Sequence, residues 1–166
     1  MFIRIKKIRH KRYAYLVKNI WSKRKKCSRQ KVIKYFGPVI KPERICNDEY
    51  YNQDIKILPS KKIFKELLEL ELINHGFKKR GRNLIKNDII INLFQKKVNQ
   101  VQAPIVIEAN EGFLCNYTLT KLYNFKTKTF NPKLEGKRLA NTILQAGIIL
   151  NEDIFVCLFN KLYKKP

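Results

Sequence analysis

Basic side chains are concentrated in the first quarter of the chain, where they have no acidic counterparts. Residues 1–41 contain fifteen lysines and arginines and no aspartate or glutamate. Residues 42–166 contain twenty-one basic and thirteen acidic residues, so +15 of the formal net charge of +23 lies in the first segment. Such an uneven distribution is the electrostatic footprint of a surface that contacts a polyanion. The sequence therefore predicts a nucleic-acid-binding surface within residues 1–41, dominated by phosphate contacts.

The predicted contact residues combine basic side chains with one tryptophan. A basic connection at residues 22–28 joins two extended segments, and a two-stranded ribbon of this kind can enter the major groove of DNA. The alternative is a solvated turn whose charges only prevent edge pairing. The predicted nucleic-acid-binding residues are Arg4, Lys6, Arg9, Arg12, Trp21, Lys23, Arg24, Lys25, Lys26, Arg29, Lys31 and Lys34.

Four aromatic residues are interleaved with these charges and have two interpretations. Tyr13, Tyr15, Trp21 and Tyr35 either stack on the bases of a single strand or form the small core that a short sheet needs. Core packing is the favoured interpretation, with Trp21, beside the basic connection, as the exception.

Two carboxylates offer a different chemistry. Asp88 precedes an apolar strand and Glu108 lies in a later one, in an order that resembles restriction-endonuclease-like folds, where two carboxylates hold a divalent metal ion. The lysine that assists in those folds is absent, because the second residue after Glu108 is Asn110. A metal-dependent nuclease using Asp88 and Glu108 therefore stays an alternative, and no catalytic or metal-binding residue is assigned.

No cofactor is expected, and no membrane partner. The four cysteines form no Cys-x-x-Cys pair, and the sequence has no glycine-rich nucleotide-binding motif. No run of about eighteen apolar residues occurs, and residues 1–6 do not begin a signal peptide pattern. We therefore expect a cytoplasmic protein with reduced thiols, associated with the nucleoid or the ribosome.

The hydrophobic pattern predicts an α+β fold, in which a small basic antiparallel β-meander is followed by a mixed α+β domain with C-terminal helices. Residues 1–41 are expected to form a three-stranded module that Gly37 and Pro38 terminate, with strands at 2–8, 13–21 and 29–36. Residues 42–59 lack a clear period and are expected to be a linker to an α+β domain at 60–166.

The expected elements of residues 60–166 follow from changes of period and from turn residues. Ser60 is a candidate N-cap for a helix that Gly76 closes, and Asn131, Pro132 and Gly147 delimit another helix. Further elements are strands at 77–80, 83–85, 89–94 and 104–107, a short helix at 116–125 and a last helix after Asn151.

One segment carries a family resemblance. Tyr13 to Val17, Trp21 and the run Arg29 to Gly37 resemble the N-terminal nucleic-acid-contacting segment of insertion-sequence transposases. The resemblance implies contact with nucleic acid rather than catalysis. A transposase is not predicted, because no spaced acidic triad follows and the length cannot hold the catalytic domain after residue 60. The whole chain also resembles small basic archaeal proteins, which implies no particular activity.

These observations together predict a nucleic-acid-binding protein without catalytic activity. DNA is favoured by the resemblance, and RNA or the ribosome is the alternative, because the sequence has no consensus RNA-binding motif. A protein partner for the C-terminal domain is a further option.

Overall fold

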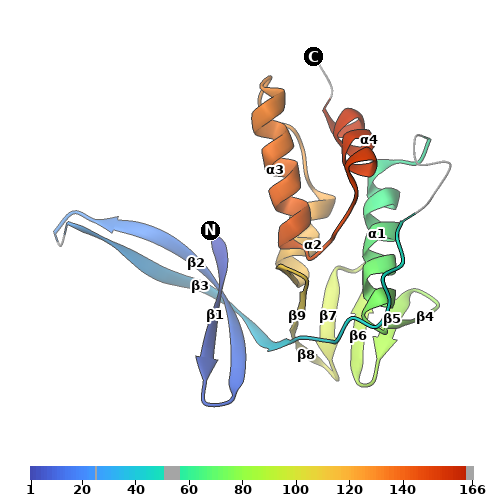
Figure 1. Cartoon of the computed structure of the whole chain (residues 1–166). Helices are drawn as coiled ribbons and strands as arrows, with labels where there is room; N and C mark the ends of the chain where they lie inside the picture. The colour runs from blue at the N-terminus through green and yellow to red at the C-terminus, as the bar shows by residue number, and fades with distance from the viewer. Residues whose placement is uncertain (25, 51–56, 164–166) are drawn as a thin grey trace.

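The computed structural model describes residues 1–24, 26–50 and 57–163 and shows an α+β protein (Figure 1). The strands are β1 Phe2–Ile8, β2 Lys11–Ser22, β3 Cys27–Ile40, β4 Lys78–Arg80, β5 Asn83–Lys86, β6 Ile89–Asn92, β7 Lys97–Gln100, β8 Ala103–Pro104, β9 Val106–Ala109 and β10 Gly112–Leu114. The helices are α1 Ser60–Asn74, α2 Asn116–Tyr123, α3 Pro132–Gln145 and α4 Glu152–Leu162.

The first sheet begins with the predicted antiparallel meander and has the order β1-β2-β3-β9-β10. The prediction that Gly37 and Pro38 would end the third strand is wrong. β3 runs on to Ile40 because Val39 and Ile40 pair in parallel with β9. Gly37 has φ +113°, and a Cβ atom there would lie 2.1 Å from the carbonyl oxygen of Pro104. Glycine is therefore required where the strand passes from β2 to its new neighbour.

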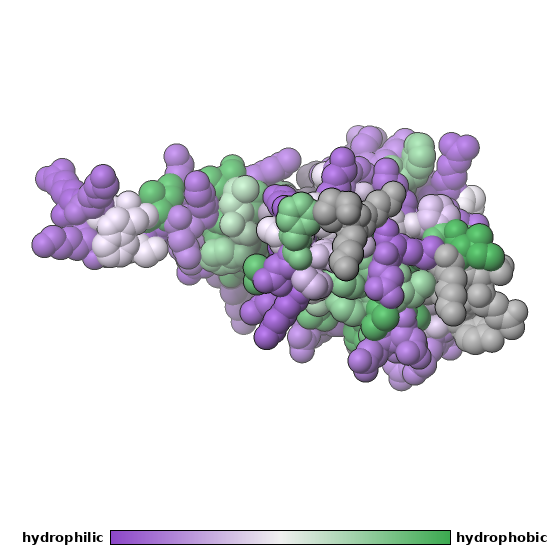
Figure 2. Space-filling model, turned by 90° about the horizontal axis from the view of Figure 1, so that it is seen from above, coloured by the Kyte–Doolittle hydropathy of each residue, from purple (hydrophilic) through white to green (hydrophobic). Residues whose placement is uncertain are grey.

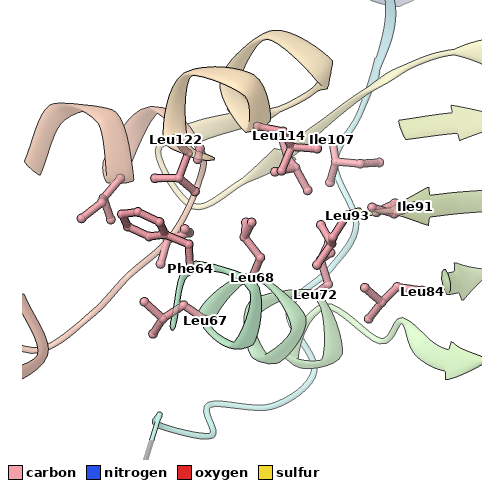
Figure 3. Packing of buried hydrophobic residues seen from close by; sticks show 14 of the residues in the cluster. Phe64, Leu67, Leu68, Leu72, Leu84, Ile91, Leu93, Ile107, Leu114 and Leu122 are labelled. Carbon is pink, nitrogen blue, oxygen red and sulfur yellow. The ribbon is translucent and has the colours of Figure 1, made fainter. Parts of the chain in front are cut away.

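The main core surrounds the buried face of α1 and takes side chains from the second sheet, from β9 and β10 and from the other three helices. The second sheet is an antiparallel meander with the order β4-β5-β6-β7-β8. Helical spacing puts Phe64, Leu68 and Leu72 on one buried face of α1. Figure 3 shows this face meeting Leu84 and Ile91 from the sheet. Because burial of one such side chain contributes about 1.5–3 kcal/mol, this core gives the body of the protein most of its stability.

A smaller apolar cluster attaches the meander to the body. Ala14, Leu16 and Phe36 from β2 and β3 are buried together with Val106 of β9 and Cys115 before α2. Only part of β2 and β3 takes part, because both strands continue well beyond these residues. The meander is thus fixed at its base and extends away from the body (Figure 1).

Most of the expected helix ends are confirmed. The side chain of Asn131 accepts a hydrogen bond from the Leu134 amide, and that of Asn151 accepts one from the Ile154 amide. The expectation for Ser60 is wrong: Pro59 takes the N-cap position, and Ser60 is the first helical residue. Within the described ranges, no helix is long and apolar enough to cross a membrane.

Candidate nucleic-acid interface

The outer halves of β2 and β3 form a two-stranded ribbon, here called the arm and defined as residues 18–24 and 26–31. The pairing of β1 with β2 reaches only to Val17, so no third strand of the described chain supports the ribbon beyond that point. Figure 1 shows the arm projecting from the body, and Figure 2 shows hydrophilic side chains crowded at its end. Lys18 to Trp21 and Lys26 to Lys31 are all exposed. An isolated two-stranded hairpin is only marginally stable, so a contribution to the stability of the fold does not explain why the chain has an arm.

The pairing within the arm brings like charges together. Lys18 lies directly opposite Lys31, and Ile20 lies opposite Arg29. Like charges in directly opposed positions destabilise a sheet. Since residues 1–41 contain no acidic residue, nothing on the arm offsets this repulsion. An anion bound to this face would remove the penalty.

Strand alternation gives the arm two chemically different faces. Lys18, Ile20, Arg29 and Lys31 share one face, because directly opposed residues point to the same side. The other face carries Trp21 opposite Ser28, and Asn19 opposite Gln30. One face can therefore contact phosphates, and the other offers an aromatic ring and amide groups.

The turn at the end of the arm holds the remaining predicted cations. Lys23, Arg24 and Lys26 are exposed, and Lys26 has φ +45°. The predicted residue Lys25 lies outside the described residues. Trp21, next to the turn, is 64% exposed, which leaves its ring accessible to a ligand.

A surface cluster of tyrosines lies on the meander behind the arm. The ring of Tyr35 lies 5.2 Å from that of Tyr15 and 6.3 Å from that of Tyr13. Tyr35 is 50% exposed, and none of the three belongs to either apolar core cluster. Partial burial, with Tyr13 and Tyr15 nearby, raises the pKa of Tyr35, so its hydroxyl stays protonated at neutral pH. The interpretation of these tyrosines as core residues is therefore not what the structure shows.

The predicted cations of β1 border this tyrosine cluster. Lys6 lies over the ring of Tyr15, with its ammonium 5.1 Å from the ring centroid. Arg4 donates a hydrogen bond to the side chain of Gln30, which connects β1 with the base of the arm. Arg9 is exposed in the turn between β1 and β2, and Lys34 is exposed with its ammonium 5.9 Å from the centroid of the Phe36 ring.

One predicted contact residue has a carboxylate partner instead. Arg12 forms an ion pair with Glu108 of β9, and Lys41 approaches the same carboxylate to 3.5 Å. The Glu108 side chain is only 13% exposed. Sequence reasoning could not find this pair, because the two residues meet only through the parallel pairing of β3 with β9. Arg12 thus ties the meander to the body, and its charge is partly neutralised.

The structure does not bring the two candidate nuclease carboxylates together. Asp88 lies in the turn between β5 and β6 of the second sheet, where its carboxylate accepts a hydrogen bond of 2.7 Å from Gln100. Glu108 belongs to the first sheet and is paired with Arg12. In the part of the chain that the structure describes, no group of three or more histidine, cysteine, aspartate or glutamate side chains could hold a metal ion.

Lys18 was absent from the predicted set although it lies on the same face of the arm as Arg29 and Lys31. Its partner Lys31 was predicted, and counting back from the turn along both strands would have identified the pair. By contrast, Lys79 of β4 is paired with Glu69 at 2.7 Å, so its charge is partly neutralised.

The chain was compared with protein-family models, curated proteins and solved structures. None of the three comparisons finds a match. The resemblance of residues 13–37 to transposase segments therefore stays a prediction.

Proposed function

We propose that this protein binds nucleic acid through the arm, without catalysing a reaction on it. The observation that carries the proposal is the facing pair Lys18 and Lys31 on a projecting ribbon that has six described cations and no acidic residue. A polyanion compensates these charges and gives the ribbon the contacts that it lacks in the folded chain. Arg4, Lys6, Arg9 and Lys34 extend the positive surface toward the body.

Duplex DNA is the form of nucleic acid that best fits this shape. The major groove of B-form DNA admits a two-stranded β-ribbon, whereas that of A-form RNA is too deep and narrow for side chains to read. In such a complex the face with Lys18, Arg29 and Lys31 contacts phosphates. The face with Asn19, Trp21 and Gln30 then meets the groove floor, since amide side chains can pair with adenine edges. The proposal includes a cytoplasmic location at the nucleoid.

The proposal is tested with the full chain and a variant in which Lys23, Arg24, Lys26 and Arg29 are replaced by glutamine. Fluorescence anisotropy on duplex DNA should show affinity lower by about 10³ at 150 mM salt, if each residue contacts one phosphate. The matched control replaces the exposed residues Lys78, Lys97, Lys133 and Lys137 by glutamine and changes the net charge equally.

Two outcomes would contradict the proposal. An equal loss in the control variant would mean that only net charge matters and that the arm has no special part. Tighter binding of structured RNA than of duplex DNA, lost in the arm variant, would assign the arm to RNA instead and associate the protein with the ribosome.

A further inference from the structure

A cavity of about 660 Å³ opens in the body of the protein, away from the arm in sequence. The first turn of α1, the β4–β5 turn, the β6–β7 turn and the end of α2 line it, and no lining residue belongs to residues 1–41. Its size lies within the range of about 300–1,000 Å³ that is typical of ligand-binding pockets.

The charged residues among those that line this cavity are all positive. Lys61, Lys62 and Lys65 come from α1, Arg82 from the β4–β5 turn and Lys96 from the β6–β7 turn. Among the described residues no acidic side chain lines the cavity, although Glu69 lies 3.5 Å from Lys65. Lys61 and Lys62 lie in the first turn of a helix, where the positive end of the helix dipole disfavours cations. An anionic ligand would offset this repulsion.

Aromatic and apolar side chains complete the lining. Phe94, in the β6–β7 turn, is 81% exposed, while its neighbour Leu93 is buried in the core. A phenylalanine held at the rim of a basic cavity offers a stacking surface for a planar group. Tyr123 also lines the cavity, and burial, with Glu69 nearby, raises its pKa, so its hydroxyl stays protonated.

A second basic pocket adjoins the first. It has a volume of about 570 Å³ and shares Asn124 with the first cavity. Lys121, Lys126, Lys128 and Arg138 line it, with Arg138 also paired with Glu135, and no acidic residue of the described ranges lines it. Two neighbouring pockets that share Asn124 and have cations along both suit a chain of phosphates better than a single phosphate.

We propose that these two pockets form a second binding site, which takes a single strand of nucleic acid with one base stacked on Phe94. The phosphates lie along the lysines and arginines of both pockets, and the strand passes Asn124 between them. This site uses none of the residues of the arm, so it does not depend on the function proposed for the arm.

The experiment uses the full chain carrying the four glutamine substitutions in the arm, so that the arm contributes as little as the chain allows. The probes are fluorescent oligothymidylate and oligouridylate of about 16 nucleotides, because one binding unit of this kind covers about 4–16 nucleotides. Phe94→Ala should weaken binding of the strand by about 5- to 150-fold, the usual contribution of one stacked base. Phe130→Ala is the matched control, since Phe130 is 76% exposed outside both pockets.

Lys96→Gly is a second variant that does not risk the fold. Lys96 has φ +57°, a conformation that glycine adopts without strain, so the variant removes a charge without disturbing the turn. Its affinity should fall about fourfold at 150 mM salt, and the salt slope should decrease by about 0.7.

The outcomes separate the two proposals. Weaker strand binding in Phe94→Ala and Lys96→Gly, but not in Phe130→Ala, supports the proposed binding site in the two pockets. The probe that binds more tightly shows whether the strand is DNA or RNA. Unchanged binding in both pocket variants, or displacement by thymidine monophosphate as effective as by the unlabelled strand, would overturn the site as a strand-binding groove. Duplex binding by the chain with an intact arm should be the same in Phe94→Ala as in the native sequence.

Discussion

Neutralising the facing lysines of the arm, Lys18→Gln with Lys31→Gln, should weaken nucleic-acid binding without weakening the fold. If each of the six described cations of the arm contacts one phosphate, the logarithm of the affinity falls with a salt slope of about −5.4. Raising salt from about 50 to 200 mM then costs about 10³ in affinity. With four contacts left the slope becomes about −3.6, the same change costs about 150-fold, and affinity at 150 mM falls about 30-fold.

The stability of the double variant should move in the opposite direction. The two lysines are direct cross-strand neighbours, so their removal relieves a repulsion of about 0.2–1 kcal/mol. Thermal unfolding should therefore show a melting temperature that is equal to or slightly above that of the native sequence. A variant that binds less and is no less stable separates loss of contacts from loss of structure.

The assay has a probe in the chain itself. Trp21 is the only tryptophan of the sequence and is 64% exposed on the arm, so its emission should change when DNA covers it. A salt titration followed by anisotropy and by Trp21 emission should give the same affinity. An unchanged salt slope in the double variant, or saturating DNA that leaves Trp21 emission unaltered, would refute the assignment of the contact to the arm.

Three further predictions test how the body holds the meander and the helices. Gly112→Ala should lower the free energy of unfolding by about 3 kcal/mol or more, because a Cβ there would lie 2.1 Å from the Leu144 carbonyl oxygen. Gly81→Ala is the control: Gly81 has φ +57° and no neighbour within 4 Å, so this substitution should cost only about 1–2 kcal/mol. Equal losses in denaturant unfolding would contradict the close packing of Gly112 against Leu144. Burial works to raise the pKa of Glu135, but hydrogen bonds from Arg138 and Thr129 outweigh it and lower the pKa, so its ionised form stabilises the fold above about pH 4.3 and this contribution is lost as pH falls further. The difference in melting temperature between the native chain and Glu135→Gln should therefore shrink from pH 7 to pH 3, and a constant difference would argue against the ionised pairing. Glu108→Gln should free Arg12 and raise affinity for duplex DNA by up to about fivefold at 150 mM salt, whereas magnesium-dependent cleavage that the substitution abolishes would restore the nuclease alternative.

Local signals in the sequence were enough for much of the architecture. The meander was predictable because β-branched and aromatic residues alternate along β1 and β2, and the helix starts because Asn131 and Asn151 supply side-chain caps. The parallel contact of β3 with β9 was not predictable, since it joins residues far apart in sequence through backbone pairing. β7 and β10 were missed because strands of four and three residues contain too few side chains to show a period.

The candidate site was likewise predictable only where its residues are close in sequence. The basic residues of the arm could be predicted from the uneven charge distribution, because they lie close together in the sequence. Arg12 was predicted as a nucleic-acid contact, and its ion pair with Glu108 could not be predicted, since Glu108 comes from a distant strand. The basic cavity around Phe94 was not predictable for a similar reason. Its cations come from one helix and two turns, and each turn alone has the composition of an ordinary loop.

The location of the cores explains how the arm can be free for binding. Phe64, Leu68 and Leu72 stabilise the body without any contribution from residues 18–31, and the second cluster secures β2 and β3 only near Ala14, Leu16 and Phe36. A ribbon that is fixed at its base and unsupported beyond Val17 can change its conformation without disturbing either core. Its six described cations can therefore repel one another in the free protein at little cost to the fold as a whole, and on the function proposed here that repulsion would be recovered as affinity for a polyanion.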